Sequence, residues 1–281
     1  MAVAGVGLCG LAAVAWTLLG GGAGQQGDER APVAWATLGT ADVHALAFDP
    51  TDSDRVYFGH HGGLWESTDG GRSWHATGLS GADAMNVPIA DSQRFQIAGH
   101  NVYMETTDGG ASWQSVPNDL PGLDLHAFAI DPADLDHAWT FAVGFGLFET
   151  SDAGRHWQQR QPGNWAALTA YRVGETTVLL AVGPQGGGRS ADGGASWAPL
   201  AYPGAPVAAF AASADGSTLY AATHAGLRRS GDGGATWSET GFASPALALA
   251  AAPDDPMDVA LVDEATRFYR SPDGGTSWPA P

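Results

Sequence analysis

An eight-residue pattern, Ser/Thr-x-Asp-x-Gly-x-x-Trp, occurs six times in this 281-residue chain and constrains its fold more than any other feature. The first copy runs from Ser67 to Trp74 and the last from Ser271 to Trp278. Counted between their aspartates, successive copies lie 39, 44, 40, 40 and 41 residues apart. The defining residues of the six copies are Asp69, Gly71, Trp74, Asp108, Gly110, Trp113, Asp152, Gly154, Trp157, Asp192, Gly194, Trp197, Asp232, Gly234, Trp237, Asp273, Gly275 and Trp278. A period near 40 residues that is built from short strands is typical of the blades of a β-propeller.

Each residue type in this pattern has a structural explanation. The aspartate accepts hydrogen bonds from backbone N–H groups and so closes a tight turn between two strands. The glycine two residues later adopts a backbone angle that a side chain would disfavour. The tryptophan three residues further on buries a large ring under the hairpin. We therefore predict that these residues are structural and that their turns, at the outer part of one face, are not where a ligand binds.

The repeat predicts an all-β fold: a six-bladed β-propeller with four-stranded antiparallel blades. In the first blade VHALAF is the expected inner strand, followed by VYFGH, GLWES and, after the repeated turn, SWHATG. Later inner strands are expected to start near Asn86, Leu125, Ala166, Val207 and Leu247. Residues Val33 to Gly39, with Trp35 in the place of the repeat tryptophan, are expected to pair into the last blade and close the ring. Closure would remove the free sheet edges that promote aggregation.

The repeated pattern resembles the Asp-box, or BNR, repeat of sialidases, sortilin-type receptors and large β-glucanases. The resemblance covers residues 43–281. Phrases such as GLWESTDGGRSW and LHAFAIDPADLDHAW are most similar to those of small secreted bacterial proteins described as glycosylhydrolase-like or exo-sialidase-like. The resemblance implies a propeller of the sialidase superfamily and raises the hypothesis of a glycoside hydrolase.

The arginines argue against a sialidase, which needs three of them to converge on the carboxylate of its substrate. Arg72 and Arg155 lie inside the repeated turns. Five more lie on the strands that lead into these turns: Arg189, Arg228, Arg229, Arg267 and Arg270. Arg94, Arg160 and Arg172 do not stand at the start of an inner strand. No arginine triad is visible, and whether the protein is an enzyme stays open, with a non-enzymatic role favoured.

The first residues of the chain predict export. Residues 1–24 carry no charge and are hydrophobic enough for a signal peptide or a membrane anchor, and residues 25–32 are a linker by composition. The propeller is therefore expected to occupy residues 33–281 and to be extracytoplasmic in a bacterium, whether secreted, periplasmic or anchored and facing outward. Cleavage, lipidation and retention of the segment all stay open. Cys9 is the only cysteine, so no disulfide forms within the chain.

The charge of the chain restricts its partners. The net charge is −18, and all twelve basic residues are arginines. An acidic surface repels phosphate backbones and anionic lipids, so we expect no nucleic-acid partner and membrane contact only through the N-terminal segment. A glycan, a small ligand or a protein remains open as the partner. We expect the protein to be a monomer.

Histidines gather on the face opposite the repeated turns. His44 and His126 stand where inner strands are expected to begin, and four others stand in or beside the hairpins of the second and third strands: His60, His61, His100 and His224. Asp42, Asp124 and Glu264 add carboxylates nearby. Imidazoles gathered around an axis could bind a transition metal or hydrogen-bond a sugar or a carboxylate. Each histidine taken singly is equally well explained as a turn residue.

Three functions follow from this face. The leading hypothesis is a module that binds a ligand or partner through its histidines. The first alternative is a glycoside hydrolase that acts on glycans at the same face, which would require two carboxylates beside a cleft. The second is a metal-binding protein, with a transition metal at the histidine cluster as the one cofactor that the residues suggest.

Overall fold

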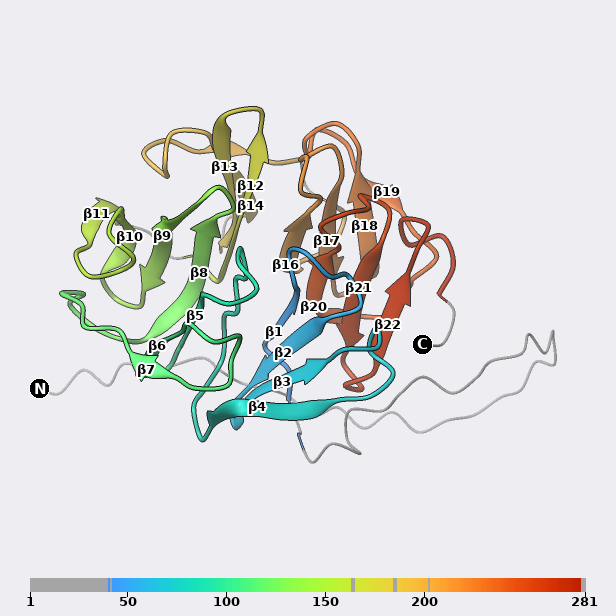
Figure 1. Ribbon diagram of the computed structural model, residues 1–281. Coiled ribbons are helices and arrows are strands. Elements are labelled where there is room, and N and C mark those ends of the chain that lie inside the picture. Colours follow the sequence, from blue (N-terminus) through green and yellow to red (C-terminus); the bar gives the residue numbers. More distant parts are fainter. Residues whose placement is uncertain (1–39, 41, 163–164, 184–185, 202, 279–281) are drawn as a thin grey trace, which may run out of the picture.

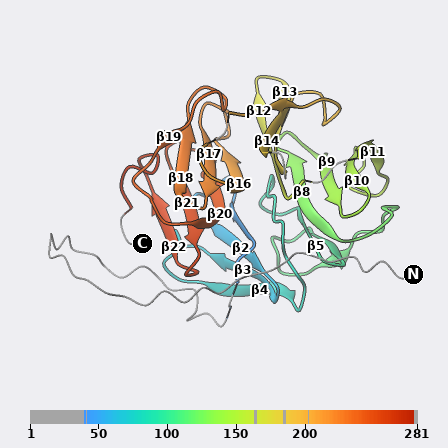
Figure 2. The same cartoon turned by 180° about the vertical axis from the view of Figure 1, so that it is seen from behind.

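The computed structural model describes residue 40 and residues 42–162, 165–183, 186–201 and 203–278. Within these residues, six antiparallel sheets stand around a central axis as the blades of a propeller (Figures 1 and 2). The prediction of an all-β six-bladed propeller is confirmed. Among the described residues no helix is long and apolar enough to span a membrane.

Four of the blades have four strands each. Blade 1 consists of β1 (Ala45–Phe48), β2 (Val56–His60), β3 (Gly63–Ser67) and β4 (His75–Ser80). Blade 3 consists of β8 (Leu125–Asp131), β9 (Asp134–Ala142), β10 (Gly146–Thr150) and β11 (Gln158–Gln161). Blade 4 consists of β12 (Ala167–Val173), β13 (Thr176–Gly183), β14 (Gly186–Ser190) and β15 (Ala198–Pro199). Blade 5 consists of β16 (Val207–Ala212), β17 (Leu219–Thr223), β18 (Gly226–Ser230) and β19 (Ser238–Glu239).

Two blades have three strands in the described residues, and in blade 2 this corrects the expectation of four. Blade 2 consists of β5 (Phe95–Gly99), β6 (Val102–Thr106) and β7 (Gln114–Ser115). Its expected inner strand is reduced to one bridge between Asn86 and Ala98. Pro88, two residues further on, has no N–H to donate to a neighbouring strand, and this limits the pairing.

Blade 6 consists of β20 (Ala246–Ala251), β21 (Val259–Asp263) and β22 (Phe268–Ser271). The strand expected from Val33 to Gly39 lies outside the described residues, so closure of the ring by that strand stays a prediction. The packing of blade 6 on blade 1 is observed. The ring of Trp74 contacts Phe58 of its own blade and Phe268 of blade 6, with centroid distances of 5.3 and 5.4 Å.

The hydrophobic core is divided into six clusters, one between each pair of neighbouring blades. Tyr57 and Phe95 join blades 1 and 2, for example, and Trp139 and Leu179 join blades 3 and 4. The remaining clusters join blades 2 and 3, 4 and 5, 5 and 6, and 6 and 1. Each sheet buries both of its faces, so the orientation of a blade depends on its two neighbours.

The repeated turns have the structure that their sequence predicts. In all six copies one carboxylate oxygen of the aspartate accepts the backbone N–H of the residue four positions later, at 2.8–2.9 Å. The glycine of the pattern has a φ of 82–94° in every copy. In five copies the tryptophan Nε1–H donates to the carbonyl of this glycine, at 2.8–3.1 Å, whereas Trp237 donates to Ala201.

These hydrogen bonds lower the pKa of the turn aspartates. In Asp192, Asp232 and Asp273 the side-chain hydrogen bond from the hydroxyl four residues later, followed by the backbone N–H of the same residue, lowers the pKa from 3.8 to about 2. A carboxyl group with a lowered pKa in the folded state stabilises the fold above its unfolded-state pKa. That contribution is lost as the pH falls through the folded-state value.

We expect the free energy of unfolding to decrease as the pH falls from about 4 to about 2, because the turn aspartates take up protons in this window. Asp232→Asn removes one of these groups and should make the decrease shallower. Urea unfolding at a series of pH values measures both profiles. Identical pH profiles for the variant and the wild-type protein would contradict the assignment.

A second prediction concerns the glycines of the turns. A Cβ on Gly71 would lie 2.2 Å from a ring carbon of Phe268, and a Cβ on Gly233 would meet no heavy atom within 4 Å, although both glycines have positive φ. A left-handed backbone costs a residue with a side chain about 1–2 kcal/mol. Gly233→Ala should therefore destabilise the fold by about that amount, and Gly71→Ala should destabilise it clearly more. Equal midpoints of thermal unfolding for the two variants would exclude this close contact between blades.

Candidate functional site

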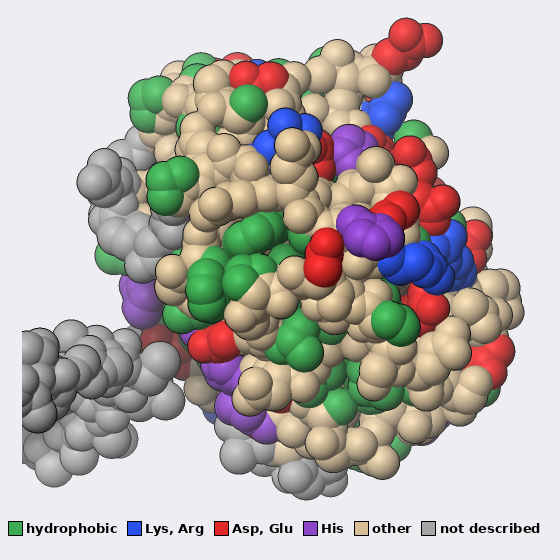
Figure 3. All heavy atoms as spheres, turned by 90° about the vertical axis from the view of Figure 1, so that its left-hand side faces the viewer, with side chains coloured by type: hydrophobic (Ala, Val, Ile, Leu, Met, Phe, Trp, Pro, Cys, Tyr) green, Lys and Arg blue, Asp and Glu red, His purple; other side chains and the backbone are tan. Residues whose placement is uncertain are grey.

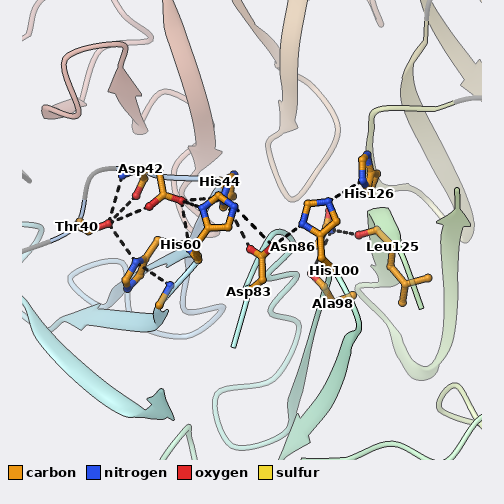
Figure 4. Close-up of polar contacts among 12 residues, drawn as sticks. Thr40, Asp42, His44, His60, Asp83, Asn86, Ala98, His100, Leu125 and His126 are labelled. Atoms are coloured by element: carbon orange, nitrogen blue, oxygen red, sulfur yellow. Dashed lines mark hydrogen bonds and ion pairs between the residues drawn. The ribbon is translucent and has the colours of Figure 1, made fainter. Parts of the chain in front are cut away.

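A row of histidines and aspartates crosses three blades on one face of the ring (Figure 4). It is supplied by the segments that enter the inner strands and by the turns between the second and third strands of blades 1 and 2. We call it the His–Asp row and define it as Asp42, His44, His61, Asp83, His100, Asp124 and His126.

The first group of the row belongs to blade 1. Asp42 and His44 precede β1, and His61 lies in the turn between β2 and β3. Nε2 of His44 lies 2.9 Å from Oδ2 of Asp42 and 3.0 Å from Nδ1 of His61. Nδ1 of His61 is also hydrogen-bonded to Oδ2 of Asp42. One carboxylate oxygen and two imidazole nitrogens therefore face a common point.

The second group joins blades 2 and 3. Nε2 of His100, in the turn between β5 and β6, lies 3.0 Å from Nε2 of His126 in β8. Oδ1 of Asp124 lies 3.0 Å from the same atom of His126 and 3.5 Å from Nε2 of His100. A backbone bridge between His100 and Asp124 holds the turn against the start of β8. The arrangement repeats the first group with residues of two different blades.

Asp83 connects the two groups. It lies between β4 and the bridge residue Asn86, and its Oδ2 is 2.6 Å from Nδ1 of His100. Its two carboxylate oxygens also lie 3.8 Å from Nε2 of His44 and 3.9 Å from Nε2 of His61. The backbone at Asp83 can come this close because position 99 is a glycine, where a Cβ would lie 1.9 Å from the carbonyl oxygen of Asp83.

Burial and neighbouring charges change the pKa values at the first group. Burial, and then repulsion by His61, lower the pKa of His44. Burial raises the pKa of Asp42, but hydrogen bonds from His61 outweigh it, so the pKa is lowered on balance. His44 is therefore held neutral and Asp42 ionised at neutral pH, which leaves lone pairs on both.

The six predicted histidines separate into three sets. His44, His61, His100 and His126 meet in the row. His60 lies beside it, where Nδ1 is 3.1 Å from Oγ1 of Thr40 and the ring packs on Phe58, so its contacts are those of a structural residue. His224 lies apart in blade 5, exposed and 4.0 Å from Glu264 of blade 6.

The central cavity is lined mostly by apolar side chains. It has a volume of about 250 Å³ and is lined by the inner strands of five blades and by residues 85–90 of blade 2. Of the described residues that line it, His44 is the only titratable one; the others are mostly alanine, leucine, isoleucine and phenylalanine. The described lining residues include neither the carboxylate pair of a glycoside hydrolase nor the arginine triad of a sialidase.

Sequence reasoning missed two parts of this face. Asp83 stands in a connection between blades. Its position shortly before the expected inner strand near Asn86, like that of Asp42 and Asp124 before theirs, was the one signal that could have identified it. Val143 and Phe145, in the turn between β9 and β10, are 38% and 46% exposed. The N–H of Val143 donates to the carbonyl of Asp124, so this apolar pair lies directly beside the second group.

The acidity of the chain is evident on its surface. In Figure 3 acidic side chains are spread over the side of the molecule in view, and histidines lie close to several of them. Several arginines are paired with acids elsewhere, such as Arg172 with Asp131 and Arg270 with Asp258.

The hydrogen bond from His100 to Asp83 leads to a test. An ionised carboxylate only accepts hydrogen bonds, so Nδ1 of His100 must carry the proton and Nε2 must present a lone pair. Nitrogen NMR of chelator-treated protein, above the pH at which imidazoles take up protons, should show this tautomer. Asp83→Asn should shift His100 towards a mixture of tautomers and leave His224 unchanged. If the nitrogen signals of His100 were the same in Asp83→Asn and in the wild-type protein, this hydrogen bond would be ruled out.

Comparison with protein families identifies the repeat. Residues 32–187, more than half of the chain, match the family described as photosynthesis system II assembly factor YCF48. Curated protein sequences yielded no match. The expectation of a BNR-type propeller is thus confirmed. The family that this match supports is that of the assembly factor.

Solved structures share the fold. A structure described as YCF48 bound to D1 peptide has 24% identity and a TM-score of 0.55, over 85% of this chain and 81% of that chain. YCF48 from Cyanidioschyzon merolae has 18% identity and a TM-score of 0.54, over 84% and 83%. The GH74 xyloglucanase from Xanthomonas campestris has 19% identity and a TM-score of 0.57, over 84% of this chain but 44% of the enzyme. At these identities the similarity shows the fold alone.

Proposed function

The chain belongs to the family of the photosynthesis system II assembly factor YCF48, and from this premise we propose that it is a partner-binding propeller rather than a hydrolase. Its partner is a segment of another protein, which binds on the face of the His–Asp row. Residues 1–24 export the propeller or anchor it outside the membrane.

The family supports this proposal through one relative, which is described as YCF48 bound to a D1 peptide. That relative has the same fold and is described in complex with a peptide. A propeller suits this task because loops of several blades meet at one face and can contact a single extended segment together.

The observation that carries the proposal is the exposed pair Val143 and Phe145 beside the row. Among the described residues only one other large hydrophobic side chain is comparably exposed, that of Val173, the last residue of β12, at the opposite end of the sheets. An exposed aromatic residue next to polar side chains is typical of an anchor point in a protein interface. Phe145 supplies such an anchor, and the row supplies hydrogen-bonding groups around it.

The charge of the face favours a basic segment. Asp42, Asp83 and Asp124 lie in the row, and the whole chain carries a net charge of −18. Complementary charge steers partners towards an interface and selects among them. The preferred segment therefore combines an apolar or aromatic residue with arginine or lysine.

The glycoside hydrolase alternative receives no such support. The cavity at the axis is lined mostly by apolar side chains, and none of its described lining residues carries a carboxylate. The similarity to xyloglucanases concerns the fold, which hosts many functions.

Selection from a displayed peptide library against the full chain tests the proposal. We expect enriched peptides to contain aromatic and basic residues, and we expect Phe145→Ala to weaken their binding about tenfold, which is the effect of losing a central aromatic anchor. Val173→Ala is the matched control, because it removes a similarly exposed apolar side chain far from the row, and it should leave binding unchanged.

Two outcomes would refute partner binding at this face. One is binding that Phe145→Ala and Val173→Ala weaken equally. The other is the release of sugar from glycans by the purified chain, with no peptide enriched, which would favour the hydrolase alternative.

A further inference from the structure

We propose that the His–Asp row binds divalent transition-metal ions of the zinc type at two triads of two histidines and one aspartate. The triads are Asp124–His100–His126 and Asp42–His44–His61, and the first is the stronger site. This inference goes beyond partner binding and does not depend on it, because it concerns the coordination chemistry of the row itself.

The spacing of the ligand atoms suits a metal ion. Zinc binds imidazole nitrogen and carboxylate oxygen at about 2.0–2.2 Å, so neighbouring ligand atoms lie about 2.8–3.6 Å apart for angles at the metal from a right angle to the tetrahedral value. In the triad of His100, His126 and Asp124 the three separations are 3.0, 3.0 and 3.5 Å. In the other triad His44 lies 2.9 Å from Asp42 and 3.0 Å from His61, and the shorter contact between His61 and Asp42, a hydrogen bond, must lengthen for an ion to enter. Each triad can therefore occupy one side of a coordination sphere.

Hydrogen bonding leaves the stronger site unsatisfied. Oδ1 of Asp124 is buried and accepts no hydrogen bond among the described residues, although it lies 3.0 Å from Nε2 of His126. Two imidazole Nε2 atoms also face each other at 3.0 Å in this triad. A cation at the common point would bind the lone pairs of all three atoms at once. A single proton forms a hydrogen bond between only two of them.

Asp83 gives His100 the support that metal-binding histidines usually have. A ligating imidazole typically donates its other N–H to a carboxylate, which fixes the tautomer and directs the lone pair at the metal. Nδ1 of His100 is 2.6 Å from Oδ2 of Asp83, so Nε2 of His100 is free to face Asp124 and His126. Asp83 does not touch the common point itself and acts as a positioning residue.

The donor set selects the class of metal. Two imidazoles and one carboxylate suit zinc and its neighbours among the transition metals, whereas calcium takes six to eight oxygen ligands. The side chains of His100 and Asp124 are 43% and 47% exposed, so the ion can enter from solvent and keep water in its remaining positions. Since His100 belongs to blade 2 and His126 to blade 3, the ion would also hold these two blades together.

The test is a calorimetric titration of Zn²⁺ into the full chain, purified with a tag that contains no histidine and treated with a chelator. We expect two Zn²⁺ ions to bind, Ca²⁺ not to compete, and the midpoint of thermal unfolding to rise with Zn²⁺. His126→Ala should abolish the tighter site and its effect on unfolding. Asp83→Asn, which keeps all three ligands, should weaken that site by about 10–100-fold.

His156→Ala is the matched control. His156 is also paired with a carboxylate, Asp152, at 2.6 Å, but it lies in a repeated turn and outside the His–Asp row. The variant should bind Zn²⁺ as the wild-type chain does. Equal loss of Zn²⁺ binding in His156→Ala and His126→Ala, or no Zn²⁺ binding by the wild-type chain, would overturn the proposal. Peptide binding that depends on Phe145 would survive that result, so the two proposals fail separately.

Discussion

The packing of one blade on the next is the constraint on which the rest of this structure depends. Each sheet has hydrophobic residues on both faces, and the core is a ring of six clusters between sheets. The ring of Trp74 illustrates this, because it closes a turn of blade 1 and at the same time contacts Phe268 of blade 6. These contacts set the angle between blades. They therefore also set the position of the loops on the face that carries the His–Asp row.

The His–Asp row is a product of that packing. Its residues come from the start of β1, from two turns, from a connection between blades and from the start of β8. Within one blade, pairing between strands places Asp42, His44 and His61 together. Between blades, the bridge from His100 to Asp124 brings two further histidines to the same distance. Two similar triads thus arise from one repeat geometry, with Asp83 between them.

Three features support the proposed binding role: a central cavity lined mostly by apolar side chains, the polar row and the exposed aromatic turn. Catalysis on glycans depends on carboxylates placed on either side of the bond that breaks. The axis of this propeller presents alanine, leucine and phenylalanine instead. Phe145 and the row lie on the same face, where an extended segment of a partner can reach both, and this supports a role in binding.

The sequence by itself determined the number of blades and the turns of the Asp-boxes, because the pattern is complete within eight consecutive residues and recurs six times. Of the six tryptophans only Trp74 is fully buried, and the others are half-buried. It also indicated that most histidines lie on one face. Successive strands of a blade run in opposite directions, so every second connection lies on the same face of the ring. Only the tertiary structure decided which histidines meet. His60 packs on Phe58 and His224 lies apart, whereas His44, His61, His100 and His126 converge with Asp83. The shortened inner strand of blade 2, near Pro88, likewise appeared only in the fold. These features depend on how neighbouring blades pack, and contacts between residues far apart in the chain leave no local pattern to recognise.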